Sequence, residues 1–202
     1  MFSTGYSSIN NDITAFEVPI EPKDIETNRV VMLALDESLT SQYALEYAKE
    51  NVIKPTDLVC ILNCMPTSTP PPIEALDAGA MFIDSGYLQE QQKYYDTHSK
   101  FILKAYAKVL PKNKIRLFSV MGDNRDEIVR ASKNLKVDLL VIGSRDHASL
   151  QRFFLGSTSD YCIHNMDCPV FVVKPPHGQS IVPILPSTKT AAQEIHDKSK
   201  VN

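Results

Sequence analysis

The chain has 202 residues, of which 43% are hydrophobic and 22% are charged, and this suits one globular domain with extensions or at most two small domains. Its 21 Lys and Arg residues against 24 Asp and Glu residues give a net charge of -3, so the basic surface typical of nucleic-acid-binding proteins is missing. The seven glycines fit neither GxGxxG nor GxxxxGK[ST]. A Rossmann dinucleotide fingerprint and a P-loop are therefore excluded.

Nothing in the sequence predicts membrane insertion or secretion. No apolar stretch approaches the roughly 18 to 20 residues that span a bilayer, and the acidic first residues lack the apolar region of a signal peptide. We therefore expect a soluble, cytoplasmic protein with neither a membrane nor a nucleic acid as partner. Its four cysteines, which we expect to be reduced, are Cys60, Cys64, Cys162 and Cys168. The spacing of Cys162, His164 and Cys168 matches no familiar zinc pattern, so buried thiols are expected there and the identity of any metal stays open.

The first half of the chain shows an apolar strand, an amphipathic helix and a second apolar strand. Residues 1–28 are polar without an apolar period and predict a flexible N-terminal tail. The run over 29–35 predicts a strand covered on both faces, and apolar residues at helical spacing predict a helix over 39–48. A second buried strand is predicted over 58–64, where a proline run ends it. Residues 66–86 are irregular and predict a loop that folds over a site.

The second half continues the same alternation. In chain order it predicts a helix over 88–109, a strand over 114–120, a helix over 124–132, a strand over 137–142, a short helix over 157–163 and a strand over 169–173. Asp123 with Asp126, and Ser157 with Asp160, have the spacing of capping boxes at two helix starts. Residues 176–202 lack either apolar period, and they predict a flexible C-terminal tail.

Alternating strands and helices over residues 29–175 predict a single α/β domain. The expected architecture is a doubly wound, five-stranded parallel sheet with helices on both faces and right-handed crossovers. Ligands on such sheets bind at the carboxyl ends of the strands, where the strand order reverses. The loops after the first, second and fourth strands are therefore the places to expect a site.

The loop after the fourth strand has the chemistry of an anion site. Gly156 and Ser157 stand at a predicted helix N-terminus, where free backbone N–H groups and the helix dipole favour a phosphate. Gly143, at the strand end, would let the backbone approach a ligand closely. An ordinary strand-to-helix loop, in which Ser157 is only an N-cap, explains the same residues.

Several of these features together resemble the universal stress protein family of the ATP-binding type. That family's signature is Gly, two residues, Gly, nine residues, Gly, then Ser or Thr, and Gly143, Gly156 and Ser157 occupy three of these four places. The match extends to Asp36 after the first strand, to the Gly122-Asp123 step and to the phrase VDLLVIGSR, and it covers residues 29–175. The resemblance implies a Rossmann-like sheet of the adenine nucleotide alpha hydrolase type, with strand order 3-2-1-4-5.

The resemblance also implies that the chain binds ATP or AMP. It places Asp36 near the adenosine, although this carboxylate also suits a helix cap. The implied nucleotide contacts are Asp36, then Asn63, Cys64 and Met65 around the adenine, Gly143 and Ser144 along the ribose and phosphate path, and Gly156, Ser157, Thr158 and Ser159 as phosphate donors.

Asp146 departs from the family pattern because it stands where the second signature glycine belongs. A carboxylate beside phosphates is repulsive by about 1 kcal/mol or more in a partly solvated site. Arg145 would offset this charge, or Mg²⁺ would bridge Asp146 to the phosphate oxygens.

Three functions follow in order of preference. The first is a nucleotide-binding regulatory stress-response protein that changes conformation or partner and is not an enzyme, since no motif places a general base or a nucleophile. The second is a nucleotide-free dimeric interaction module, because Asp146 replaces the glycine. The third is a slow ATPase or nucleotidyl transferase. The resemblance further implies a homodimer formed through the strand at 169–173.

Overall fold

The computed structural model describes residues 6–9, 13–16, 29–65, 85–110, 113–144, 155–176 and 181–185. The strands are β1 (Tyr6–Ile9), β2 (Ile13–Phe16), β3 (Arg29–Ala34), β4 (Asp57–Met65), β5 (Lys114–Met121), β6 (Leu139–Gly143) and β7 (Val170–Val173). The helices are α1 (Leu39–Asn51), α3 (Ser85–Ala107), α4 (Asn124–Leu135) and α5 (Ser157–Asn165). None of these described helices combines the length and the apolar character needed to cross a membrane.

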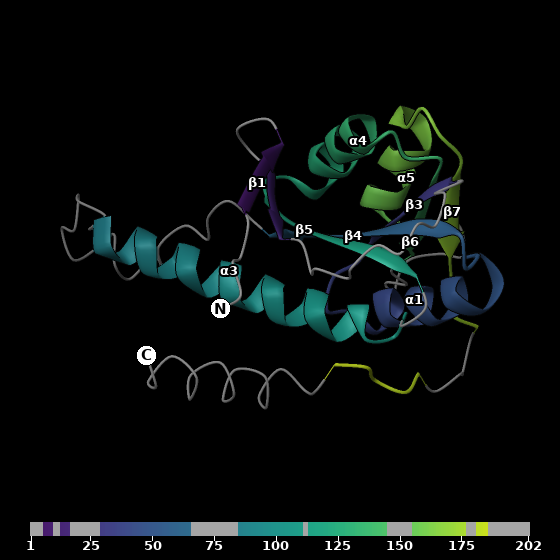
Figure 1. Cartoon of the computed structure of the whole chain (residues 1–202), viewed down its shortest axis with the longest axis horizontal. Coiled ribbons are helices and arrows are strands. Elements are labelled where there is room, and N and C mark those ends of the chain that lie inside the picture. The colour runs from purple at the N-terminus through teal and green to yellow at the C-terminus, as the bar shows by residue number, and fades with distance from the viewer. Residues whose placement is uncertain are drawn as a thin grey trace.

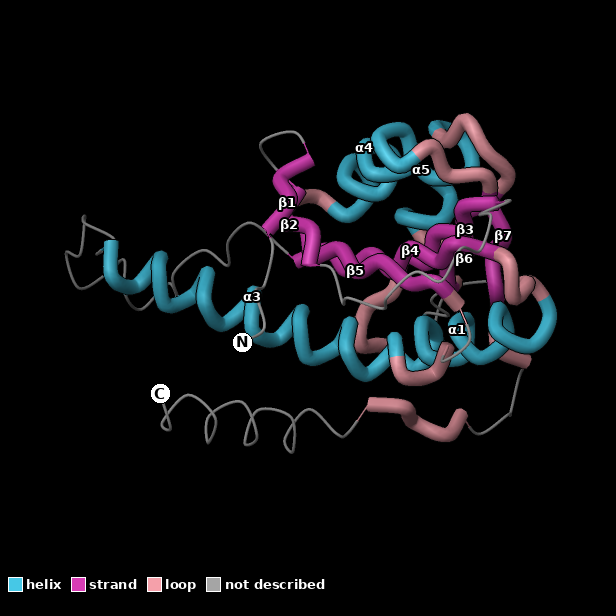
Figure 2. Tube along the Cα trace, in the orientation of Figure 1, coloured by secondary structure: helices cyan, strands magenta, loops and turns pink. Residues whose placement is uncertain are grey.

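The strands form one sheet in the order β1-β2-β5-β4-β3-β6-β7, which runs edge-on through the middle of the molecule in Figure 2. Its last five strands are parallel, and they stand in the predicted order 3-2-1-4-5. The prediction of fold class is thereby confirmed. The strand order reverses at β3, because the chain passes from β3 to β4 on one side and later places β6 on the other side of β3.

Two helical layers enclose the sheet. Figure 1 shows α1 and α3 along one face and α4 and α5 along the other. The side chains of β3 alternate between the two layers. Val31 and Leu33 pack with α1 and α3, whereas Met32 and Ala34 pack with α4 and α5. Because side chains alternate between faces and both faces are covered, the strand reads as an uninterrupted apolar run.

Residues 1–28 contain structure that the sequence did not predict. Strand β1 pairs antiparallel with β2, and β2 pairs antiparallel with the outer edge of β5, with Thr14 opposite Ser119. The flexible tail predicted over residues 1–28 thus contains two strands that the sequence pattern did not predict. Each is four residues long, which is too short to show a clear alternating period, and the pairing partner lies far along the chain.

The segment 181–185, expected to belong to a flexible C-terminal tail, packs against the domain. Leu185 is 7% exposed and joins the core on the α1 and α3 side, with Ile184 packed beside it. The backbone N–H groups of Ile184 and Leu185 both donate to Oε1 of the buried Gln42 on α1, at 2.6 Å and 3.0 Å. This part of the predicted flexible C-terminal tail therefore makes tertiary contacts that the sequence pattern did not predict.

Candidate functional site

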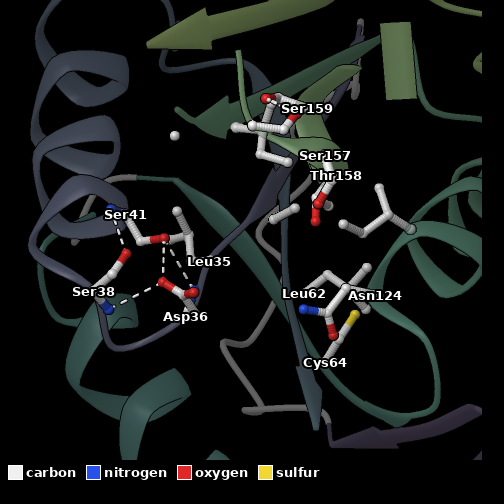
Figure 3. Close-up of a pocket in the computed structure, with 15 residues that line it drawn as sticks. Leu35, Asp36, Ser38, Ser41, Leu62, Cys64, Asn124, Ser157, Thr158 and Ser159 are labelled. Atoms are coloured by element: carbon white, nitrogen blue, oxygen red, sulfur yellow. Dashed lines mark hydrogen bonds between the residues drawn. The ribbon is translucent and has the colours of Figure 1, made fainter. Parts of the chain in front are cut away.

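Two adjoining cavities lie at the carboxyl ends of β3 and β4, where the strand order reverses. The inner cavity has a volume of about 150 Å³ and the outer cavity one of about 890 Å³. The residues that line both are Asp36, Cys64, Asn124, Ser157 and Thr158. The two cavities thus form one connected site, whose inner part is shown in Figure 3.

Asp36 is held in place at the border of the two cavities. Its Oδ1 atom accepts hydrogen bonds from the Ser38 N–H at 3.0 Å and from the Ser41 hydroxyl at 2.7 Å (Figure 3). The N-cap of α1 is Ser38, whose side chain accepts from the Ser41 N–H, so capping does not explain Asp36. From α3, the Tyr106 hydroxyl donates to the Asp36 carbonyl at 2.6 Å, and burial raises the pKa of this phenol. The carboxylate is therefore oriented by its surroundings before any ligand arrives.

The N-terminus of α5 forms the opposite side of the site. Gly156 occupies the N-cap position with φ 81° and ψ 142°, and as a glycine it has no side chain that could cap the helix. The prediction that Ser157 is the cap is wrong, because Ser157 is already the first helical residue. Ser157 and Thr158 line both cavities. Since no side chain among the residues that the structure describes accepts from the first turn, the N–H groups there suit an anion.

Ser159 and Ser144 have structural partners. Ser159 lines the inner cavity, but its hydroxyl donates to the carbonyl of Leu155 one turn earlier. Ser144 lines neither cavity: it is 1% exposed, its hydroxyl donates to the Leu155 carbonyl, and its N–H donates to the Val173 carbonyl. Ser144 thus links the start of α5 to the end of β6, whereas Ser159 bonds within the start of the helix itself.

Gly143 lines the inner cavity, yet its lack of a side chain has a second explanation. A Cβ atom at this position would lie 3.0 Å from the carbonyl oxygen of Thr40 on α1. Close packing of β6 against α1 therefore requires glycine here, whether or not a ligand is bound.

The end of β4 supplies Asn63, Cys64 and Met65, which all line the outer cavity. Burial raises the pKa of the Cys64 thiol far above its ordinary value, so the group is a neutral thiol at physiological pH. A neutral thiol is a poor nucleophile. Asn63 is 1% exposed, and its Nδ2 atom donates to the Leu35 carbonyl at 2.8 Å.

Helix α3 contributes a wall of the outer cavity that the sequence analysis did not identify. The wall consists of Tyr94, Tyr95 and His98, with Glu37 from the loop after β3. The rings of Tyr94 and His98 stack with centroids 5.8 Å apart and an angle of 7° between their planes. His98 Nε2 lies 3.1 Å from Glu37 Oε2. These residues lie on the apolar stripe of the helix, and spacing alone does not separate core positions from cavity positions.

Residues 27–174 match the model of the universal stress protein family. The chain belongs to the universal stress protein family. The family predicted from the sequence resemblance over residues 29–175 is thereby confirmed.

Curated relatives and solved structures agree with this assignment. The chain is similar to universal stress proteins PHOS34 and PHOS32 of Arabidopsis thaliana, with 30% identity over 169 residues and 28% over 162 residues. The matched regions cover 73% of this chain in both cases, but only 62% and 65% of the two relatives, so the chain spans less than two thirds of their length. The structure of MJ0577 from Methanocaldococcus jannaschii has the same fold, with a TM-score of 0.58, 22% identity, and coverage of 76% of this chain and 100% of that one. The Arabidopsis thaliana protein At3g01520, solved with AMP bound, has a TM-score of 0.51, 18% identity, and coverage of 80% and 99%.

Two predicted contacts of this universal stress protein domain, Arg145 and Asp146, lie outside the described residues. The proposed Mg²⁺ bridge involves Asp146, so it also lies outside the described residues. Within the ranges that the structure describes, no group of three or more His, Cys, Asp or Glu side chains is placed to hold a metal ion.

Proposed function

We propose that this universal stress protein binds ATP or AMP across the inner and outer cavities and acts through nucleotide-dependent changes of conformation or partner, without catalysis. One observation carries the proposal: the oriented carboxylate of Asp36 and the N-terminus of α5, where Gly156 supplies no capping side chain, border the same connected site. These are the acceptor that a ribose or an adenine amine needs and the donors that a phosphate needs. AMP in the solved structure of a family member with this fold supports the choice of ligand.

The cavity volumes support a ligand that enters both parts of the site. Small-molecule sites usually have volumes of roughly 300 to 1,000 Å³. The inner cavity, at about 150 Å³, is too small for a whole nucleotide, whereas the outer cavity, at about 890 Å³, has room for the remainder. We place the phosphates at Ser157 and Thr158, which line both cavities, and a ribose hydroxyl at Asp36.

A regulatory function is preferred to an enzymatic one because the groups in the site are explained as ligand contacts. Cys64 is held as a neutral thiol by burial. Asp36 already accepts two hydrogen bonds through Oδ1 and is therefore better suited to holding a ligand than to taking up a proton. Slow hydrolysis of ATP is the corresponding enzymatic alternative.

The second candidate function is a nucleotide-free interaction module, and Asp146 favours it. Its carboxylate stands at a signature glycine position beside the phosphate path that the family resemblance implies. Repulsion there is about 1 kcal/mol for one phosphate charge, and Mg²⁺ between the two groups would remove it. AMP carries less charge than ATP, so the proposal expects AMP to tolerate Asp146 better.

We also propose that the protein is a homodimer joined through β7. This strand pairs with β6 on one side, and the described residues supply no strand for its other side. Phe171 in β7 is 39% exposed, although it stacks on Tyr47 of α1. An apolar strand with an unpaired edge is suited to pairing with a second copy.

Isothermal titration calorimetry with ATP and AMP, with and without Mg²⁺, tests the proposal. We expect saturable binding of at least one nucleotide, and prolonged incubation with ATP should release at most a trace of phosphate. Rapid, saturable ATP hydrolysis would favour the enzymatic alternative. Absence of binding both by the wild type and by Asp146→Gly would leave the interaction module as the function.

A further inference from the structure

The segment 181–185 is joined to the candidate site by a chain of hydrogen bonds. The segment lies on the side of α1 and α3 away from the sheet (yellow in Figure 1), and two of its backbone N–H groups donate to Gln42 Oε1. Gln42 Nε2 donates at 2.9 Å to the carbonyl of Glu37. The Glu37 carboxylate lies 3.1 Å from His98 Nε2, and both side chains line the outer cavity. The segment therefore reaches the site through one side chain.

The docked segment fixes the orientation of the Gln42 amide. Because an N–H group can only donate, the segment holds the oxygen and thereby directs Nε2 toward the Glu37 carbonyl. The side chain is 3% exposed, so water does not compete for these bonds. When the segment leaves, Oε1 loses both donors and becomes accessible to water, and the side chain gains other rotamers. The Glu37 carbonyl then loses a donor of fixed position.

The loop after β3 depends on this donor. Two helix side chains hold its backbone: Tyr106 donates to the carbonyl of Asp36, and Gln42 donates to the carbonyl of Glu37. Loss of one of these bonds leaves the loop less ordered. A ligand that uses Asp36 must then order the loop as it binds, which lowers its affinity. A docked segment therefore favours an occupied site.

The segment has few buried contacts within the part of the chain that the structure describes. Leu185 is 7% exposed in the core beside α1 and α3, whereas Val182 is 84% exposed. Segments with little buried surface open locally at a low free-energy cost, so a ligand can shift their equilibrium. The match to the family model ends at residue 174, so this segment is an addition to the shared domain.

We propose that the segment 181–185 is a conformational switch whose docking is coupled to the occupancy of the nucleotide site. The docked segment strengthens nucleotide binding, and by thermodynamic linkage the bound nucleotide favours docking by the same factor. Loss of nucleotide shifts the segment toward release, which uncovers Leu185 and the apolar surface of α1 and α3 around it. This inference rests on the proposed nucleotide binding and names the conformational change that it regulates.

Hydrogen exchange tests the coupling in the intact full chain. Saturating AMP should slow exchange of the Ile184 and Leu185 amides about fivefold or more, because both donate to Gln42. The Asp138 amide donates to the Val30 carbonyl at the opposite ends of the strands and is the control, which should change less. An equal effect on all three amides would indicate general stabilisation and would overturn the coupling.

A matched pair of substitutions tests the reverse direction. Leu185→Asp places a charge at a buried position and should undock the segment, so the affinity for AMP measured by calorimetry should fall about fivefold. Val182→Asp adds the same charge at an exposed position and should leave the affinity unchanged. Circular dichroism checks that both variants are folded. Because coupling is reciprocal, the loss of affinity should not exceed the gain in exchange protection.

The outcomes separate this inference from the function beneath it. AMP that binds the wild type without protecting the Ile184 and Leu185 amides would overturn the switch and leave nucleotide binding intact. Equal affinity of folded Leu185→Asp and Val182→Asp for AMP would do the same. Absence of both AMP and ATP binding by the wild type would contradict the proposed function itself, and the coupling with it.

Discussion

Asp36 shows how one side chain can belong to both the fold and the site. Its Oδ1 atom accepts from Ser38 and Ser41 at the start of α1, while its backbone carbonyl accepts from Tyr106. These bonds hold the carboxylate at the border of the two cavities. Any ligand that uses Asp36 therefore meets a group whose position is already determined.

Asp36→Asn should weaken nucleotide binding about tenfold while leaving stability nearly unchanged. The amide oxygen can keep the two hydrogen bonds within the protein, but the negative charge that strengthens a bond from a ribose hydroxyl is lost. Calorimetry measures the affinity, and thermal melting measures the stability. Asp167→Asn is the matched control, since it removes an equal charge from a side chain that is 80% exposed and lines neither cavity. Equal affinities of the two variants would rule out a ligand role for Asp36.

Asp146→Gly should strengthen ATP binding about fivefold and AMP binding less, because it removes a carboxylate from the implied phosphate path. The gain should shrink at high salt, which screens repulsion. Titrations of both nucleotides at two salt concentrations check this. If the substitution leaves the affinity for ATP unchanged, Asp146 does not face the phosphates.

At the scale of an element, the segment 181–185 is connected to the site through a single side chain. Gln42 accepts from the backbone of this segment through Oε1, and its Nε2 atom donates at 2.9 Å to the carbonyl of Glu37, the residue after Asp36. The side chain is 3% exposed, so all three bonds are largely shielded from water. The segment thus stabilises the loop that carries Asp36.

Gln42→Leu should lower the free energy of unfolding by about 1–3 kcal/mol, because two backbone donors lose their shared acceptor. Truncation before residue 181 should lower the free energy of unfolding by a similar amount, because it removes Leu185 from the core and leaves Gln42 Oε1 unpaired. Urea unfolding measures both effects. Lys49→Gln, on the exposed side of α1, should leave stability unchanged. A Gln42→Leu variant as stable as the wild type would show that the segment does not stabilise the domain.

The five parallel strands could be predicted from sequence, whereas the peripheral elements could not. A strand covered on both faces, such as β3, reads as a continuous apolar run and is separated from the next strand by a helical period. The segment 181–185 instead depends on Gln42, which is distant in sequence and has no local signal. The cavity wall at Tyr94 has the spacing of an ordinary packed helix face. The helix cap at Gly156, in place of the predicted Ser157, could not be found from sequence, because a spacing pattern does not reveal a positive φ.

In the whole molecule, the two edges of the sheet differ in what covers them. The β1 and β2 hairpin covers the edge of β5, while β7 is the last strand at the other end. Helices α4 and α5 pack together on one face of the sheet, opposite α1 and α3 (Figure 1), and the site takes residues from both faces. A dimer formed through β7 would leave the outer cavity, which α3 borders, on the part of the sheet away from the interface.

Phe171→Asp should convert the proposed dimer into a monomer, because it places a charge on the strand expected to pair with a second copy. Sedimentation velocity at micromolar concentration measures the state. Ile163→Asp is the control, since this α5 side chain has a comparable exposure of 43%. A wild-type protein that sediments as a monomer would contradict pairing through β7.

The central claim is that an adenine nucleotide fills the two adjoining cavities, and a titration of the ¹⁵N-labelled protein with AMP, followed by amide chemical shifts, tests it most directly. We predict that the largest shifts occur at the first turn of α5, at the end of β4 around Cys64 and in the loop after Asp36, all of which line the cavities. The amides of the segment 181–185 should follow more weakly through Gln42. A spectrum unchanged by saturating AMP, or shifts confined to surfaces away from these three segments, would contradict the account.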